Sequence, residues 1–98
     1  MIFEWDEAKR QSNIEKHGID FVDILPAFQA RDRLIFRDNR GNHTEDRYIL
    51  FAPIKGRLCC AVYTIRNDTI RLITARKCND REVKHYEQKK NDQSSADR

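Results

Sequence analysis

The sequence predicts an α+β domain in which two N-terminal helices pack on a four-stranded antiparallel sheet and a third helix follows. Two apolar runs rich in β-branched residues, 58–65 and 69–75, are typical of strands. They flank Asn67 and Asp68, residue types that tolerate the positive φ of a tight hairpin turn. Shorter strands are expected at 33–37 and 46–52, with a four-residue turn at 53–56, so that short connections favour an antiparallel meander.

Capping residues and apolar spacing predict the helices. Asp6 is a suitable N-cap for a helix over about residues 7–17, and Gly18 suits the position after its end, where a positive φ costs least. Asp20 is expected to cap a second helix, and Pro26 should kink or shorten it because proline has no N–H. A third helix is predicted from about residue 80 to residue 90. The apolar face of the second helix comprises Phe21, Ile24, Leu25 and Phe28.

Length and composition indicate one globular domain. The chain has 98 residues, which we interpret as a single domain over 1–90 and a polar tail, 91–98, that we expect to be disordered. No apolar run approaches the ~20 residues of a membrane helix, and the N-terminus does not resemble a signal peptide, so we expect a cytoplasmic protein. Cys59, Cys60 and Cys78 form no Cys-x-x-Cys motif; we interpret them as buried thiols and expect no metal and no cofactor.

The positive charge is concentrated in one part of the chain. The formal net charge is +3, but residues 55–90 hold ten Lys or Arg against four Asp or Glu. This segment contains the predicted hairpin and the helix after it. Its excess of cations suggests a polyanionic partner, although solvated surface arginines are the alternative interpretation.

Strand alternation assigns side chains to the two faces of the sheet. With a two-residue turn at 67–68, Val62 pairs with Ile73, and we assign their face, with Ile49 and Phe51, to the helical core. Cys59 then pairs with Arg76 on the opposite face. A one-residue slip would exchange the two faces. The opposite face would combine aromatic and cationic groups, which suits RNA, and it comprises Tyr48, Tyr63, Leu72, Thr74 and Arg76.

A series of short motifs, spread over about residues 2–87, resembles the BrnT toxins. The first are Phe3-Glu-Trp-Asp6, Lys9, Asn13, Lys16-His-Gly18 and Phe21. The later ones are Glu45-Asp-Arg-Tyr48, Thr64-Ile-Arg66, Ile70-Arg71, Ile73-Thr-Ala-Arg76-Lys77, Arg81-Glu82 and Tyr86-Glu87. Each motif is weak, but their order and spacing together are specific. The chain departs from the family pattern at Pro26 and at Ile65.

The resemblance implies a fold, an activity and a partner. BrnT proteins are toxins of bacterial type II toxin–antitoxin pairs with a RelE-like fold, and they arrest translation by cleaving RNA. The implied partner is a BrnA antitoxin of ribbon-helix-helix type, which neutralises the toxin in a hetero-oligomer. Operator DNA would be bound only through that antitoxin.

Metal-free RNA cleavage requires a group that takes the 2′-OH proton and cations that stabilise the phosphorane. We expect Arg76, Lys77, Arg47 and Tyr86 to be catalytic, and Arg66, Arg71, Tyr63 and Arg81 to bind substrate. Glu82 could orient an arginine, act as base or cap the third helix, and we favour the cap. His17, His43 and His85 are weaker candidates for proton transfer than Lys77 and Tyr86. Two rivals are a non-catalytic RNA-binding module and a regulatory module that acts only with an antitoxin.

Overall fold

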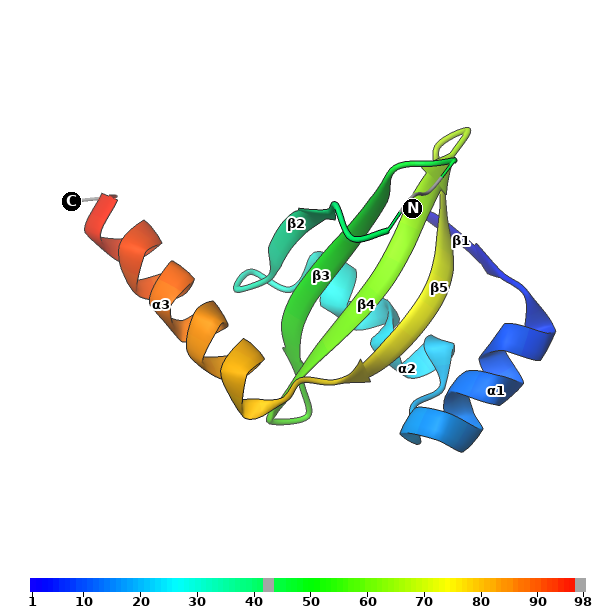
Figure 1. Ribbon diagram of the computed structural model, residues 1–98, viewed down its shortest axis with the longest axis horizontal. Helices are drawn as coiled ribbons and strands as arrows, with labels where there is room; N and C mark the ends of the chain where they lie inside the picture. The colour runs from blue at the N-terminus through cyan, green and yellow to red at the C-terminus, as the bar shows by residue number, and fades with distance from the viewer. Residues whose placement is uncertain (42–43, 97–98) are drawn as a thin grey trace.

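The computed structural model describes residues 1–41 and 44–96, with side chains described up to residue 92. Its centre is a five-stranded mixed sheet with the order β1-β5-β4-β3-β2 (Figure 1). β1 runs parallel to β5, and the other neighbouring strands are antiparallel. The strands are β1 (Ile2–Trp5), β2 (Leu34–Asp38), β3 (Arg47–Ile54), β4 (Arg57–Arg66) and β5 (Thr69–Lys77).

The predicted antiparallel meander is present as β2 to β5, but the prediction of four strands was wrong. The additional strand, β1, has four residues and pairs Ile2 with Thr69 and Trp5 with Leu72. A strand this short, followed at once by a helix cap, carries no local pattern of its own. Its partner lies more than sixty residues away, so only the folded chain reveals the pairing.

The helices begin and end where the sequence predicts, except for the last. Asp6 caps α1 (Glu7–His17) by accepting from the Ala8 N–H at 2.8 Å, and Gly18 ends it with φ +69°. Asp20 caps α2 (Phe21–Ile24), which continues as the 3₁₀ helix η1 (Leu25–Gln29) with Pro26 near its start. Pro26 therefore shortens the α-helix, as predicted.

The last helix, α3 (Asp80–Ala96), extends past residue 90, where its end was predicted, into the segment predicted to be disordered. Residues 97–98 of that segment, and His43, one of the histidines considered above for proton transfer, lie outside the described residues. Figure 1 shows α3 projecting away from the sheet, anchored near its first turns. Within the described part of the chain, no helix is long and apolar enough to cross a membrane.

The main core lies between the sheet and the segment formed by α2 and η1, which sits behind the sheet in Figure 1. We call this side the helical face and the opposite side the open face. α1 lies beside β5, whereas the prediction placed both N-terminal helices over one face. The helical face is lined by Leu50, Ala52, Cys59, Ala61, Tyr63, Leu72 and Ala75, which pack on Phe21, Ile24, Ala27 and Phe28.

The predicted assignment of the two faces was therefore wrong. Tyr63 lies on the helical face, 4% exposed, with its ring 5.0 Å from Phe28 and 5.6 Å from Tyr48. Ile49 and Phe51 belong to the open face, in a smaller cluster with Cys60, Cys78 and α3. The error has a physical cause: every residue of β4 from 59 to 64 is buried, so this strand has no polar face to mark the outside.

The two hairpin turns differ in how well they were predicted. Asn67 and Asp68 both have positive φ, 49° and 65°, as expected for a tight turn. The preceding turn uses only Lys55 and Gly56, with φ 51° and 78°, so that β3 runs on to Ile54. The four-residue turn was wrong, but a difference of two residues leaves every side chain on the same face.

β5 contains a bulge that the sequence did not predict. Tyr63 pairs with Leu72, but Val62 pairs with Thr74, so Ile73 is an extra residue on β5. Beyond the bulge, Arg76 pairs with Cys60 and not with Cys59. The pairs predicted for the far half of the hairpin were therefore wrong by one residue. Because the face assignment was also reversed, the two errors cancel for Arg76, which lies on the open face.

Candidate functional site

The open face carries a row of polar side chains across three neighbouring strands. Thr64 of β4 pairs with Arg71 of β5, and the register of β3 places Arg47 beside Thr64 on the other side. Together they line a small polar hollow of about 80 Å³, which we call the arginine hollow. Its lining residues are Lys9, Thr44, Glu45, Arg47, Thr64, Arg66, Arg71 and Ile73.

The segment before β3 is held over the sheet by two contacts. The buried hydroxyl of Thr64 donates to the Asp46 carbonyl oxygen at 2.7 Å. The guanidinium of Arg66 donates through Nε to Glu45 Oε2 at 2.7 Å and through Nη2 to Oε1. The hydrogen bonds from Arg66 hold the pKa of the Glu45 carboxyl below its ordinary value. Glu45 is therefore ionised at neutral pH and orients Arg66 at the rim of the hollow.

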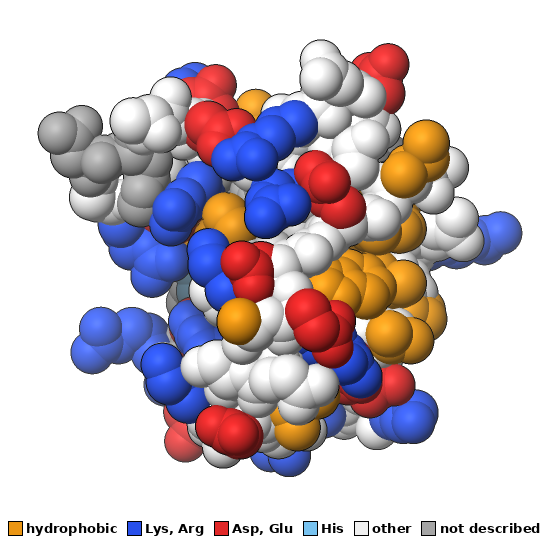
Figure 2. All heavy atoms as spheres, turned by 90° about the vertical axis from the view of Figure 1, so that its right-hand side faces the viewer, with side chains coloured by type: hydrophobic (Ala, Val, Ile, Leu, Met, Phe, Trp, Pro, Cys, Tyr) orange, Lys and Arg blue, Asp and Glu red, His pale blue; other side chains and the backbone are white. Residues whose placement is uncertain are grey.

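The charge of the arginine hollow favours an anion. Four cationic side chains line it, against the single carboxylate of Glu45. Arg71 lies 3.7 Å from Glu4, both partly exposed, and exposed ion pairs of this kind contribute little. A phosphate could therefore replace these carboxylates at small cost, and arginine binds phosphate with two parallel hydrogen bonds. Figure 2 shows Lys and Arg gathered toward the open face, among some acidic groups, with hydrophobic side chains on the other side.

Arg76 is held firmly at a separate place on the open face. Its Nη1 and Nη2 donate to the two carboxylate oxygens of Glu82, each at 2.7 Å. Glu82 also accepts from the Asn79 N–H, and Asn79 Oδ1 accepts from the Glu82 N–H, both at 2.9 Å. This is a complete capping box, so Glu82 caps α3 as favoured and orients an arginine as well. The hydrogen bonds from Glu82 raise the pKa of Arg76, and those from Arg76 lower the pKa of Glu82.

Besides Arg76, four of the predicted site residues do not line the arginine hollow. Lys77 pairs with Cys59 and lines a different hollow, of about 360 Å³, beside Lys55 and Arg57. Tyr86 donates from its hydroxyl to the Asp32 carbonyl oxygen at 2.6 Å, and burial raises its pKa. The other two are Arg81, exposed on α3, and Tyr63, buried in the main core.

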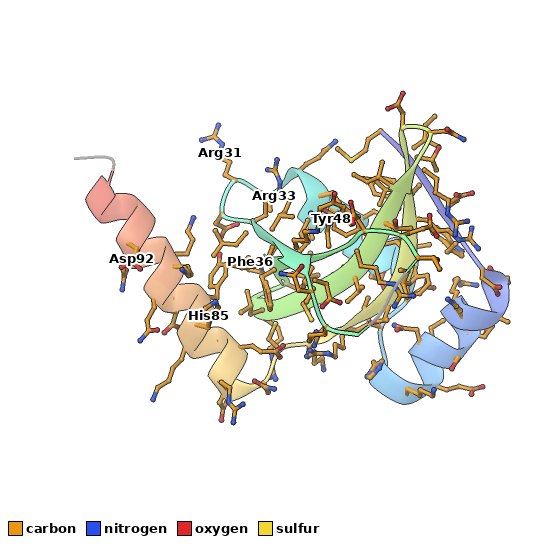
Figure 3. All side chains as sticks on the ribbon, turned by 45° about the horizontal axis from the view of Figure 1, so that its top comes forward. Arg31, Arg33, Phe36, Tyr48, His85 and Asp92 are labelled. Atoms are coloured by element: carbon orange, nitrogen blue, oxygen red, sulfur yellow. The ribbon has the colours of Figure 1, made fainter. Side chains whose placement is uncertain are left out.

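The first turns of α3 cover one end of the open face. Val83 and Tyr86 pack on the cluster of Phe51, Cys60 and Cys78. In Figure 3, Phe36 of β2 lies toward His85 of α3, and their ring centroids are 5.7 Å apart. Tyr86 and His85 therefore anchor α3, and neither lines the arginine hollow.

Sequence reasoning gave no role to two residues that shape the site. Lys9 of α1 reaches the arginine hollow. One helical turn later, the buried Asn13 donates from Nδ2 to the Ile19 and Ala75 carbonyl oxygens at 2.9 and 2.7 Å. Its Oδ1 accepts from the Ala75 N–H at 3.0 Å. The four-residue spacing of Lys9 and Asn13 places both on one side of α1, a pattern that could have identified them.

Comparison with known proteins gives one clear result. The family model for the BrnT ribonuclease toxin of type II toxin–antitoxin systems matches residues 5–82. This range contains every residue that lines the arginine hollow and ends at the capping residue Glu82. No curated protein matches the chain. Among the described residues, no three metal-ligating side chains lie together.

Proposed function

Because the chain belongs to the BrnT family, the ribonuclease toxins of type II toxin–antitoxin systems, we propose that the arginine hollow is its RNA-cleaving site. The observation that supports this most directly is the concentration of cations on an open sheet face. Lys9, Arg47, Arg66 and Arg71 line one hollow with a single carboxylate. Such a group suits the extra negative charge that develops on phosphate during cleavage.

The proposed reaction is a metal-independent transfer within the RNA. The ribose 2′-oxygen loses its proton, bonds to the adjacent phosphorus and displaces the 5′-oxygen, which takes up a proton. The product ends are a 2′,3′-cyclic phosphate and a 5′-hydroxyl. Arg47, Arg66 and Arg71 would clamp the phosphate; arginine stays protonated, so it does not serve as the base.

Two other lining residues can move protons. The phosphate would displace Glu45 from Arg66, and the freed carboxylate would accept the 2′-OH proton. Lys9, the one lysine that lines the hollow, would donate a proton to the leaving 5′-oxygen. Arg76 lies further along the open face with its charge paired by Glu82, so its role in catalysis stays a prediction. Lys77, Tyr86 and Arg81 lie outside this arrangement.

The test compares arginines inside and outside the hollow. Arg47→Gln and Arg71→Gln should each lower RNA cleavage by about 10²-fold or more, because each removes a donor to the transition state. Arg31→Gln is the matched control, since Arg31 is exposed on the segment before β2 (Figure 3) and is not among the residues that line the hollow. Far-ultraviolet circular dichroism checks that each variant is folded. If both hollow variants cleave at the wild-type rate, the hollow is not the site.

Three further measurements test the rival functions and the metal independence of the reaction. Wild-type protein that binds RNA but gives no cleavage products, even with translating ribosomes, would support the non-catalytic module. Cleavage that EDTA abolishes and a divalent ion restores would overturn metal independence. Growth arrest on expression of the isolated chain would contradict a module that acts only with its antitoxin.

We also propose that the protein arrests translation in the cytoplasm and is neutralised by a BrnA-type ribbon-helix-helix antitoxin. The support is family membership, because type II systems pair a toxin with a protein antitoxin. The toxin–antitoxin hetero-oligomer would contact operator DNA through the antitoxin. Co-expression with the product of the neighbouring reading frame should restore growth and yield a stable complex. Continued growth arrest despite expression of that product would refute this pairing.

A further inference from the structure

A second hollow adjoins the arginine hollow along the line where α1 meets β5. It measures about 250 Å³, and we call it the seam hollow. Lys9 and Ile73 line both hollows, so the two adjoin at the bulge of β5. The seam hollow is lined by Lys9, Ser12, Asn13, Lys16, His17, Ile73 and Thr74.

The seam hollow is a consequence of the fold at the edge of the sheet. β1 ends where Trp5 pairs with Leu72, so the rest of β5 has no strand on that side. α1 occupies this edge, fixed by the hydrogen bonds of Asn13 to the backbone of Ala75. Lys9, Asn13 and Lys16 are spaced at i, i+4 and i+7 and share one side of the helix. The hydrogen bonds of Asn13 therefore set where the backbone of both lysines lies along β5.

The chemistry of the seam hollow resembles that of the arginine hollow, because cations and hydroxyl groups line both. Lys16 and His17 join Lys9, and no carboxylate is among the lining residues that the structure describes. Ser12 and Thr74 add hydroxyl groups, and Ile73 is the single large apolar residue. A peptide anchor would need more apolar surface, whereas a phosphate with its ribose needs cations and hydroxyl donors.

We infer that the seam hollow is a second phosphate subsite for single-stranded RNA. The strand whose scissile phosphate lies in the arginine hollow would cross Ile73 and place a neighbouring phosphate between Lys9 and Lys16. His17 lies in the same hollow, within the last turn of α1, and adds a donor to that phosphate. The inference rests on the proposed function and assigns roles to Lys16 and His17 that cleavage itself does not require.

The test measures how RNA binding depends on salt. The probe is a fluorescein-labelled 2′-O-methyl RNA of about 12 nucleotides, within the range that single-strand sites cover. It cannot be cleaved, because its 2′-oxygen carries no proton. For single strands, each phosphate contact contributes about 0.7 to the slope of log K against log salt. Lys16→Gln should lower that slope by ~0.7, and Lys9→Gln with Lys16→Gln by ~1.4.

The matched control is Lys89→Gln, which removes the same charge from an exposed position on α3. It should leave the salt slope at the wild-type value. If Lys16→Gln also leaves the salt slope at the wild-type value, the seam subsite is overturned, even if the protein still cleaves unmodified RNA. Conversely, a reduced slope with no cleavage of unmodified RNA by the wild type would refute the proposed ribonuclease and keep the subsite. Equal losses for Lys16→Gln and Lys89→Gln would indicate a general charge effect and also overturn it.

Discussion

Replacing Asn13 by alanine should destabilise the protein more than the same replacement at any surface position of α1. Asn13 is 5% exposed and makes three hydrogen bonds, two with the backbone of Ala75 and one with the Ile19 carbonyl. Its loss leaves a buried N–H and two buried carbonyl groups without this partner. An unsatisfied buried group costs about 1–3 kcal/mol, so we expect a loss of about 3–5 kcal/mol. Domains of this size are stable by only ~5–15 kcal/mol.

Urea unfolding followed by circular dichroism measures the effect. The midpoint should fall while the m-value stays constant, if only stability changes. Gln11→Ala is the control, because Gln11 is exposed on the same helix and bonds only to Glu7; it should lose less than about 0.5 kcal/mol. Asn13→Asp keeps the acceptor but removes both donors and sets a carboxylate against two carbonyls, so it should be as unstable as the alanine variant. A loss below about 1 kcal/mol for Asn13→Ala would refute the stabilising role of the Asn13 hydrogen bonds.

Three further predictions follow from the fold. Tyr63→Ala should lose about 3–5 kcal/mol of stability in the same assay, whereas Tyr63→Phe, which keeps the buried ring, should retain RNA cleavage. Gly18→Ala should cost about 1–2 kcal/mol from backbone strain alone, since φ is +69° and an added Cβ would touch nothing within 4 Å. Hydrogen bonds from Arg10, then from the Val22 N–H, lower the pKa of Asp20 to about 2, below its unfolded value. That stabilisation is present above pH ~4 and is lost as pH falls toward ~2, so Asp20→Asn should flatten the decline of Tm over this range.

Features that depend on neighbouring residues were predictable from the sequence. The caps at Asp6, Gly18 and Asp20, the break at Pro26 and the Asn67-Asp68 turn all agree with the structure. Each is determined within a few residues, by a side chain that bonds its own backbone or by a tolerated φ. Local rules of this kind hold whatever the rest of the chain does.

Features set by distant contacts were not predictable. β1 forms only because β5 offers an edge, and the core face could not be chosen because β4 is buried on both sides. For the same reason, the sequence could not show which of the predicted site residues lie together. Arg47, Arg66 and Arg71 were identified as site residues and do converge, whereas Lys77 and Tyr86 stand in equally suggestive motifs and point elsewhere. A sequence motif can suggest candidate site residues, but it does not show on which face of the sheet their side chains lie.

The bulge at Ile73 lets β5 supply apolar residues to the core and arginines to the open face on both sides of the bulge. In a regular strand, Leu72 and Ala75 would face opposite sides, yet both are fully buried on the helical face. The extra residue allows both to pack there and puts Arg71 and Arg76, at separate places, on the open face.

A bulge at an edge exposes backbone groups, and here α1 supplies their partner. Asn13 donates to the Ala75 carbonyl and accepts from its N–H, as the peptide group of a neighbouring strand would. The same contact sets α1 against β5 and so positions Lys9 beside Arg71 in the arginine hollow. One amide side chain thus completes the sheet where β1 ends and brings the lysines of α1 to the arginines of the hairpin. A change at Asn13 that spared stability would still be expected to disturb the site.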